Sequence, residues 1–149
     1  MPLSLVARPT WCDRWLGLAV LVPLPLWGLL SLWMPLASGF DLPLREPLLY
    51  LQVALLYPVL EEIVFRGALQ GYLQERLAGR QVGGVSLANL LTSLLFSLTH
   101  LIFRSATTAM LVFLPSLIFG YFRERDGGLR IPIALHCYYN GGFYLLFVS

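Results

Sequence analysis

The sequence predicts an all-α fold: a polytopic transmembrane helix bundle of about five spans. Of its 149 residues, 58% are hydrophobic and only 12% are charged, whereas soluble domains carry about 25% charged residues. A spanning helix needs roughly 20 mainly apolar residues, so five spans with short loops fill the chain. We therefore predict a single membrane-embedded domain over residues 1–149.

The first apolar stretch, about Trp15–Leu36, is long enough to cross a bilayer. We interpret residues 15–47 as a signal anchor and the loop that follows it. A cleaved signal peptide is the alternative, because residues 37–39 are small. The anchor is favoured because the apolar run is longer than the usual core of a signal peptide and lacks a clean Ala-x-Ala cleavage site.

Four further apolar stretches follow, separated by turn-forming segments. The first of them continues as the more amphipathic Gly67–Leu77, where the helix is expected to leave the lipid. Turns are predicted at Gly79–Gly84 and at the charged segment Arg123–Arg130. The four predicted spans are about Leu48–Phe65, Val85–Phe103, Thr107–Phe122 and Ile131–Val148.

The placement of arginines predicts the orientation, because cytoplasmic loops are enriched in Lys and Arg. All ten basic residues are arginines. With the amino terminus in the cytoplasm, only Arg45 and Arg104 fall in loops on the other side. We therefore predict a cytoplasmic amino terminus and an external carboxy terminus. The arginines of the predicted cytoplasmic segments are Arg8, Arg14, Arg76, Arg80, Arg123, Arg125 and Arg130.

Charge and cysteine content argue against two other classes of protein. The formal net charge of +2 is spread along the chain and is too weak to indicate a nucleic-acid partner. Cys12 and Cys137 form no Cys-x-x-Cys pair, so neither a disulfide framework nor a zinc knuckle is predicted. The partner that the composition does imply is the lipid bilayer.

Two acids and an arginine lie inside the second predicted span. An ionisable side chain at mid-bilayer costs about 2.5–3.5 kcal/mol, so it is kept there mainly for a partner, a pathway or a reaction. Glu62 and Arg66 are four residues apart and share a helix face, which predicts a structural ion pair. Glu61 is rotated by about 100° from Glu62 and can face a different neighbour.

The two histidines of the chain also fall in apolar surroundings. His100 ends the third predicted span, and His136 shares a helix face with Asn140 in the fifth. Taken singly, such residues often serve as hydrogen-bonding contacts between membrane helices. Their occurrence together with the acids favours a reactive site.

Three motifs follow one another on successive spans: Glu-Glu-x-x-x-Arg at residues 61–66, Phe-x-x-x-His at 96–100 and His-x-x-x-Asn at 136–140. In this order they resemble the motifs of the CPBP family, which contains the type II CAAX prenyl endopeptidases and bacterial relatives linked to bacteriocin handling and protein sorting. The resemblance covers residues 48–148, which we take as the catalytic core. Larger members of the family have additional spans that this chain lacks. Accessory parts of a substrate site are therefore expected either to be missing or to be supplied by a partner.

The resemblance implies an intramembrane endopeptidase of the glutamic type, acting on a membrane-associated protein or peptide. Glu61 would be the general base, and His100 would orient the attacking water with it. His136 and Asn140 would donate hydrogen bonds to the oxyanion. Glu62 and Arg66 are the supporting pair.

Zinc is the alternative to a cofactor-free site. Glu61, His100 and His136 would be the ligands, because one carboxylate and two imidazoles can hold a catalytic zinc with an open water position. We favour a site without a cofactor, since the chain has no His-Glu-x-x-His motif and Glu62 is expected to be occupied by Arg66.

Two functions of other classes stay open. One is a non-catalytic scaffold or immunity protein that binds a peptide through the same polar pocket. The other is a small proton-coupled transporter subunit, against which the lack of an inverted repeat counts. The sequence does not decide the substrate, which could be a prenylated protein, a sorting segment or a bacteriocin-type peptide, nor the oligomeric state.

One expectation conflicts with the proposed site. Straight helices drawn from the predicted boundaries place His100 about 21 Å from the cytoplasmic start of its span, away from Glu61 and His136. The motif order favours a common site, which requires either that the third helix begin deeper in the membrane than predicted or that a span be miscounted.

Overall fold

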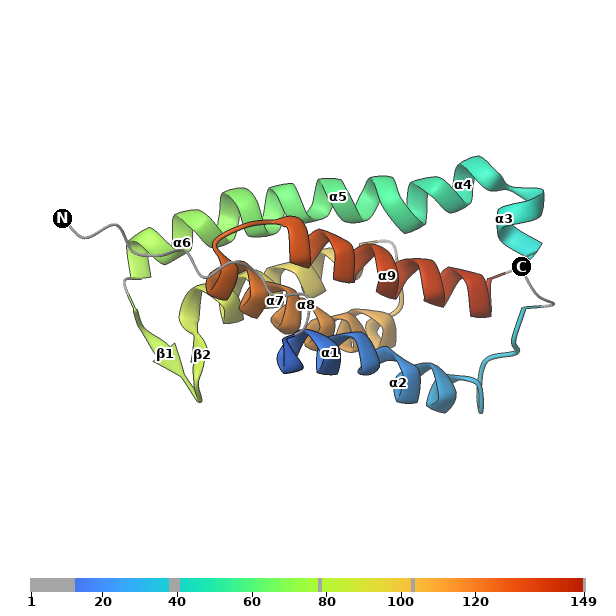
Figure 1. Cartoon of the computed structure of the whole chain (residues 1–149), viewed down its shortest axis with the longest axis horizontal. Coiled ribbons are helices and arrows are strands. Elements are labelled where there is room, and N and C mark those ends of the chain that lie inside the picture. Colours follow the sequence, from blue (N-terminus) through green and yellow to red (C-terminus); the bar gives the residue numbers. More distant parts are fainter. Residues whose placement is uncertain (1–12, 38–40, 78, 103, 149) are drawn as a thin grey trace. The chain divides into compact units, whose positions relative to one another are not determined.

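The computed structural model describes residues 13–37, 41–77, 79–102 and 104–148, and nearly all of their regular structure is helical (Figure 1). Arg8 and Cys12, and most of the small segment 37–39, lie outside the described residues. The chain forms two compact units. Among the described residues, the first unit is Glu61–Ile133 and the second unit joins residues 13–60 to residues 134–148.

The second unit begins with two short apolar helices, α1 (Arg14–Leu21) and α2 (Pro23–Leu30). Asp13 caps α1 by accepting a hydrogen bond from the amide of Trp15 at 2.9 Å. Pro23 stands in the first turn of α2, where a missing N–H is tolerated. Together they make an apolar helix over Arg14–Leu30, which ends six residues before the predicted Leu36 and falls short of a usual span.

A continuous helix of 31 residues, Pro47–Leu77, follows the short helix α3 (Asp41–Arg45). It is long and apolar enough to cross a membrane, and it confirms that Leu48–Phe65 continues without a break into Gly67–Leu77. Two of its five segments are π-helical, a rare geometry that is frequent at functional sites. The segments are α4 (Pro47–Leu51), the π-helix η1 (Gln52–Leu56), α5 (Tyr57–Glu62), the π-helix η2 (Ile63–Leu69) and α6 (Gln70–Leu77).

A two-stranded antiparallel hairpin lies between α6 and the next helix (Figure 1). Its strands are β1 (Gln81–Val82) and β2 (Val85–Ser86). The turn residues Gly83 and Gly84 have φ angles of 59° and 83°, a conformation that glycine adopts without steric cost. The predicted turn at Gly79–Gly84 is therefore present, although the sequence did not indicate its strands.

Three helices complete the chain: α7 (Leu87–His100), α8 (Ala106–Asp126) and α9 (Arg130–Phe147). The predicted third span was too long, because Val85 belongs to the hairpin and α7 has only 14 residues. Of the described helices, Pro47–Leu77 and α8 are long and apolar enough to span a membrane. The prediction of five spans is not confirmed.

The predicted charged turn at Arg123–Arg130 is shorter than expected. Helix α8 continues through the first half of this segment and ends at Asp126. The turn itself is made by Gly127, whose φ of 67° is the left-handed conformation common after helix ends. Arg123 and Arg125 thus stand in the last turn of α8. Their positive charges interact favourably there with the negative end of the helix dipole.

Helix α7 packs against α8 through a polar face in the first unit. Asn89 donates its side-chain N–H to the carbonyl of Leu117 at 3.0 Å and accepts from the hydroxyl of Ser93 at 3.1 Å. Further along, the hydroxyl of Ser97 donates to the carbonyl of Ala109. The bonds to Leu117 and Ala109 fix α7 against α8, whereas the Ser93–Asn89 bond lies within α7. All three satisfy polar groups that lipid could not solvate.

Candidate functional site

The first motif forms the predicted ion pair. Arg66 Nη1 lies 3.3 Å from Glu62 Oε1, and neither side chain has any exposed surface. Glu62 ends α5, and Arg66 lies within the π-helical η2. The positive charge of Arg66 attracts both carboxylates of the motif, that of Glu62 more strongly than that of Glu61. Glu61 is only half-buried, so the two acids differ in environment as the sequence indicated.

Helix α8 surrounds the guanidinium of Arg66. Nη2 donates to the hydroxyl oxygen of Ser116 at 2.6 Å and to its carbonyl oxygen at 2.9 Å. The ring of Phe119 lies 5.7 Å from the guanidinium carbon. The main-chain carbonyl of Arg66 accepts a hydrogen bond from Arg123 Nε at 3.1 Å. Both the side chain and the backbone of Arg66 are therefore held by α8.

Helix α7 brings His100 to the same place. Phe96 lies 4.8 Å from the guanidinium carbon of Arg66, and its ring centroid is 5.1 Å from that of Phe65 and 4.7 Å from that of His100. The Phe96 ring is thus a neighbour of the Arg66 guanidinium and of the rings of Phe65 and His100. The first and second motifs meet in the first unit.

The hydrogen bond of His100 fixes which ring nitrogen carries the proton. Nδ1 lies 2.9 Å from the carbonyl oxygen of Phe96. A carbonyl oxygen only accepts, so Nδ1 is the donor, and Nε2 of the neutral ring keeps its lone pair. When the ring is neutral, the half-buried His100 therefore has its proton acceptor at Nε2.

The predicted separation of His100 from the first motif was wrong. The helix continues for about 24 Å from Glu61 to Leu77, and α7 returns for about 20 Å from Leu87 to His100. The two lengths nearly match, so His100 comes back to the level of Phe65. The predicted boundaries did not indicate this return of His100, because they ended the membrane-embedded part of the helix soon after Gly67.

The third motif lies in the second unit, on α9. His136 is 4% exposed and engages a partner, and Asn140 is half-buried. Asn140 Nδ2 donates one hydrogen bond to the carbonyl of Val53 at 3.2 Å. The amide keeps a second N–H, so this bond orients Asn140 and leaves a donor for another acceptor.

Neighbouring bonds hold α9 in the second unit. The hydroxyl of Tyr139 donates to the carbonyl of Ala19 at 2.6 Å, and that of Tyr50 donates to the carbonyl of Gly141 at 3.2 Å. These bonds tie α9 to α1 and to α4. The third motif is thus carried by a helix that is fixed on two sides.

Within either unit, the described part of the chain has no group of three His, Cys, Asp or Glu side chains placed to hold a metal ion. The zinc alternative draws on both units, because it needs His136 as well as Glu61 and His100. The choice between a zinc site and a glutamic site therefore stays a prediction.

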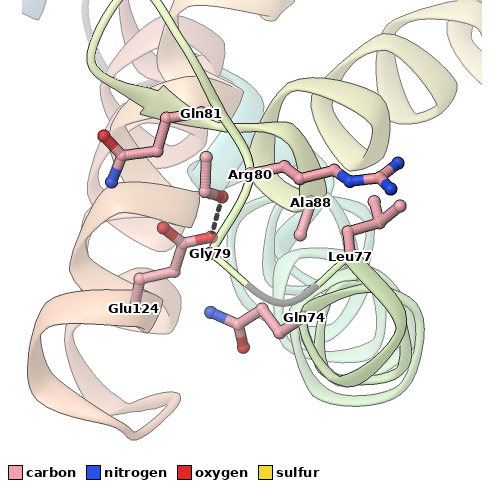
Figure 2. A pocket seen from close by; sticks show the side chains of 8 residues that line it. Gln74, Leu77, Gly79, Arg80, Gln81, Ala88 and Glu124 are labelled. Atoms are coloured by element: carbon pink, nitrogen blue, oxygen red, sulfur yellow. Dashed lines mark hydrogen bonds between the residues drawn. The ribbon is translucent and has the colours of Figure 1, made fainter.

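A shallow cavity of about 240 Å³ opens beside the hairpin, and its lining includes no residue of the three motifs (Figure 2). Glu124 and Gln81 lie on one side of it and Arg80 on the other (Figure 2). The carboxylate of Glu124 accepts hydrogen bonds from Ser86 and, at 2.8 Å, from Gln70. The volume is below the roughly 300–1,000 Å³ of ordinary ligand pockets, and the carboxylate is already engaged.

Sequence reasoning missed the residues of α8 that contact Arg66. Ser116 and Phe119 lie in a span whose apolar pattern gave no reason to single them out. A signal was present: Ser116 follows Pro115 inside a helix, and a proline there removes a backbone donor and disturbs the helix. Arg123 was counted only for orientation.

The fold and the motifs together describe a helical protein of the membrane with a buried carboxylate–arginine pair beside a histidine. A model of the type II CAAX prenyl endopeptidase Rce1-like family matches residues 43–142. The chain belongs to this protease family, which confirms the resemblance seen in the three motifs. Family membership and the two long apolar helices identify an integral membrane protein.

A curated relative is similar in sequence, and no solved structure matches. The relative is an uncharacterized 24.3 kDa protein of Escherichia coli, 35% identical over 86 residues. The matched region covers 58% of this chain and 38% of the relative. The chain thus spans less than half of the curated protein that it matches.

Proposed function

We propose that the protein is an intramembrane endopeptidase that hydrolyses a peptide bond of a membrane-associated protein or peptide near the membrane surface. The observation that carries the proposal is the meeting of the first two motifs: His100 and the Glu62–Arg66 pair share Phe96 as a neighbour. Membership of a protease family supports the same activity.

In this reaction Glu61 is the general base that takes a proton from the attacking water. His100 accepts a hydrogen bond from that water at Nε2, because Nδ1 is engaged by Phe96. The Glu62–Arg66 pair keeps Glu61 oriented and supplies a fixed positive charge nearby. His136 and Asn140 donate to the oxyanion, a role that rests on the family motif and on the free N–H of Asn140.

Cleavage by variants of the purified protein tests these roles. The probes are two internally quenched peptides that end in the same CAAX sequence, one farnesylated and one not. Glu61→Gln and His100→Gln are each expected to lower kcat by about 10²–10⁴-fold, the usual contribution of acid–base catalysis. Asn140→Ala is expected to lower it by about 10²–10³-fold, as for loss of an oxyanion donor.

Glu75→Gln is the matched control, because Glu75 is an exposed acid on the same long helix. It should cleave like the wild type. Full cleavage by Glu61→Gln would end the catalytic assignment, and wild-type protein that binds either peptide without cutting it would support the scaffold alternative. Persistence of cleavage after exhaustive chelation excludes the zinc version, whereas loss that added zinc restores would establish it.

For localisation we propose the bacterial inner membrane, with a cytoplasmic amino terminus. The arginine distribution supports this orientation, since Arg123 and Arg125 end α8 and Arg130 begins α9. The active site would then be reached from the cytoplasmic half of the bilayer.

A further inference from the structure

The guanidinium of Arg66 has no exposed surface, so its position is set entirely by its neighbours. Two of the hydrogen bonds that it makes end on a single residue outside the three motifs, Ser116 of α8. Ser116 is itself fully buried. The bond to its hydroxyl is short, at 2.6 Å, and such charge-assisted bonds are roughly twice as strong as those between neutral groups.

Two irregular helices meet at this contact. Arg66 lies in the π-helical η2, and Ser116 directly follows Pro115, which leaves α8 without one of its backbone donors. Arg123, two turns further along α8, bonds the main-chain carbonyl of Arg66. Helix α8 therefore holds Arg66 at two points, one on the side chain and one on the backbone.

We propose that Ser116 is a positioning residue for the peptidase: its hydroxyl fixes the guanidinium of Arg66 and, through it, the acids and the histidine that activate water. This inference rests on the proposed function. Arg66 pairs with Glu62 at 3.3 Å and attracts Glu61, so its position sets the field at the general base. It also lies over Phe96, the residue that contacts the His100 ring and accepts the bond from Nδ1.

The role predicted for Ser116 differs from simple packing. A packing residue affects stability and leaves the active molecules unchanged, whereas a positioning residue affects the turnover of molecules that remain folded. Binding of the peptide should be largely unaffected, since Ser116 has no exposed surface with which to touch it. The hydroxyl should therefore matter for kcat more than for KM.

The test compares wild-type protein with Ser116→Ala, Ser116→Thr and Ser93→Ala on whichever of the two quenched CAAX peptides the wild type cleaves. Ser93 is the matched control, a fully buried serine of α7 whose hydroxyl donates to Asn89 at 3.1 Å. Ser116→Ala should lower kcat about tenfold with KM changed less than about twofold, the effect of one lost bond to a charged group. Ser116→Thr keeps the hydroxyl and should regain most of kcat, and Ser93→Ala should keep wild-type kcat.

Thermal unfolding of each variant is measured beside the kinetics, so that the folded fraction is known. Wild-type kcat in Ser116→Ala would overturn the inference, as would equal losses of kcat in Ser93→Ala and Ser116→Ala. A folded Ser116→Thr variant with a kcat as low as that of Ser116→Ala would overturn the inference as well. If the wild type cleaves and Glu61→Gln does not, failure at Ser116 concerns this inference alone, whereas an inactive wild type removes the proposed function as well.

Discussion

The guanidinium of Arg66 is a full charge without water contact, and its stability depends on a small set of neighbours. Glu62 neutralises it, Ser116 accepts two of its hydrogen bonds, and Phe96 and Phe119 turn ring faces towards it. A buried pair of this kind is not itself a large source of stability, because both ions lose their hydration. Removal of one partner, in contrast, is strongly destabilising, because the remaining charge is then buried without a counter-ion.

Arg66→Met is therefore expected to destabilise the protein by about 3–5 kcal/mol, the usual result of breaking a buried ion pair from one side. The measurement is thermal or denaturant unfolding of the detergent-solubilised protein. The double variant Glu62→Gln with Arg66→Met should recover part of the loss, because no ion is then left unpaired. Arg80→Met, at an exposed arginine, should change stability by less than about 0.5 kcal/mol. Equal stability of Arg66→Met and Arg80→Met would contradict this account.

At the residue scale, the sequence predicted what is local and missed what is distant. The Glu62–Arg66 pair could be predicted because residues four apart on a helix are neighbours whatever the fold. Ser116 contacts Arg66 across 50 residues of sequence, and no spacing rule reaches that far. The hydrogen bond that fixes the His100 tautomer is again local, to Phe96, but its partner is a carbonyl that the sequence does not display.

Helices α7 and α8 of the first unit approach each other closely at Gly120. A Cβ built at Gly120 would collide with the side-chain amide of Asn89. That amide cannot easily move, because it donates to Leu117 and accepts from Ser93. The absence of a side chain at Gly120 is thus a condition for the packing of α7 on α8.

Gly120→Ala should accordingly cost about 1–3 kcal/mol of unfolding free energy, the range for overpacking a tight contact. It should also lower peptide cleavage, because α8 carries Ser116 and α7 carries His100. Gly128→Ala is the control, since nothing lies within 4 Å of a Cβ there. Unfolding and cleavage assays on both variants check the prediction, and two indistinguishable variants would refute it.

The helices were predicted better than their ends. The continuous helix over Pro47–Leu77 and the helices α8 and α9 follow from apolar stretches that are unambiguous in sequence. The first and third spans were drawn too long, because Pro35 and the hairpin residues of β2 sit in apolar surroundings that resemble a span by composition alone. Hydropathy reports burial in lipid and does not report where a backbone turns.

For the molecule as a whole, the number of spans decides on which sides of the membrane the termini lie. An odd number, such as the five predicted, places them on opposite sides, and the arginine pattern predicts a cytoplasmic amino terminus. An alkaline phosphatase fused after Ser149 should therefore be active, whereas the same enzyme fused after Asp126 should be inactive. A green fluorescent protein at each position gives the reciprocal readout.

An inactive phosphatase together with a fluorescent fusion after Ser149 would place the carboxy terminus in the cytoplasm. Five spans with a cytoplasmic amino terminus would then be wrong. The result matters because two described helices meet the length and hydropathy of a span, while α7 and Arg14–Leu30 are shorter. Sequence composition predicted a membrane protein, and the resemblance of the three motifs indicated its family. The number of crossings depends on how the bilayer accommodates the short helices.

The hairpin of β1 and β2 has a practical consequence for experiments on this protein. Gly83 and Gly84 form its turn, and a Cβ at either would meet no atom within 4 Å. The turn lies at the end of α6, about 20 Å of helix away from His100. An affinity tag or a spectroscopic label inserted between these two glycines would therefore report on the folded protein at a distance from His100, leaving both chain ends free.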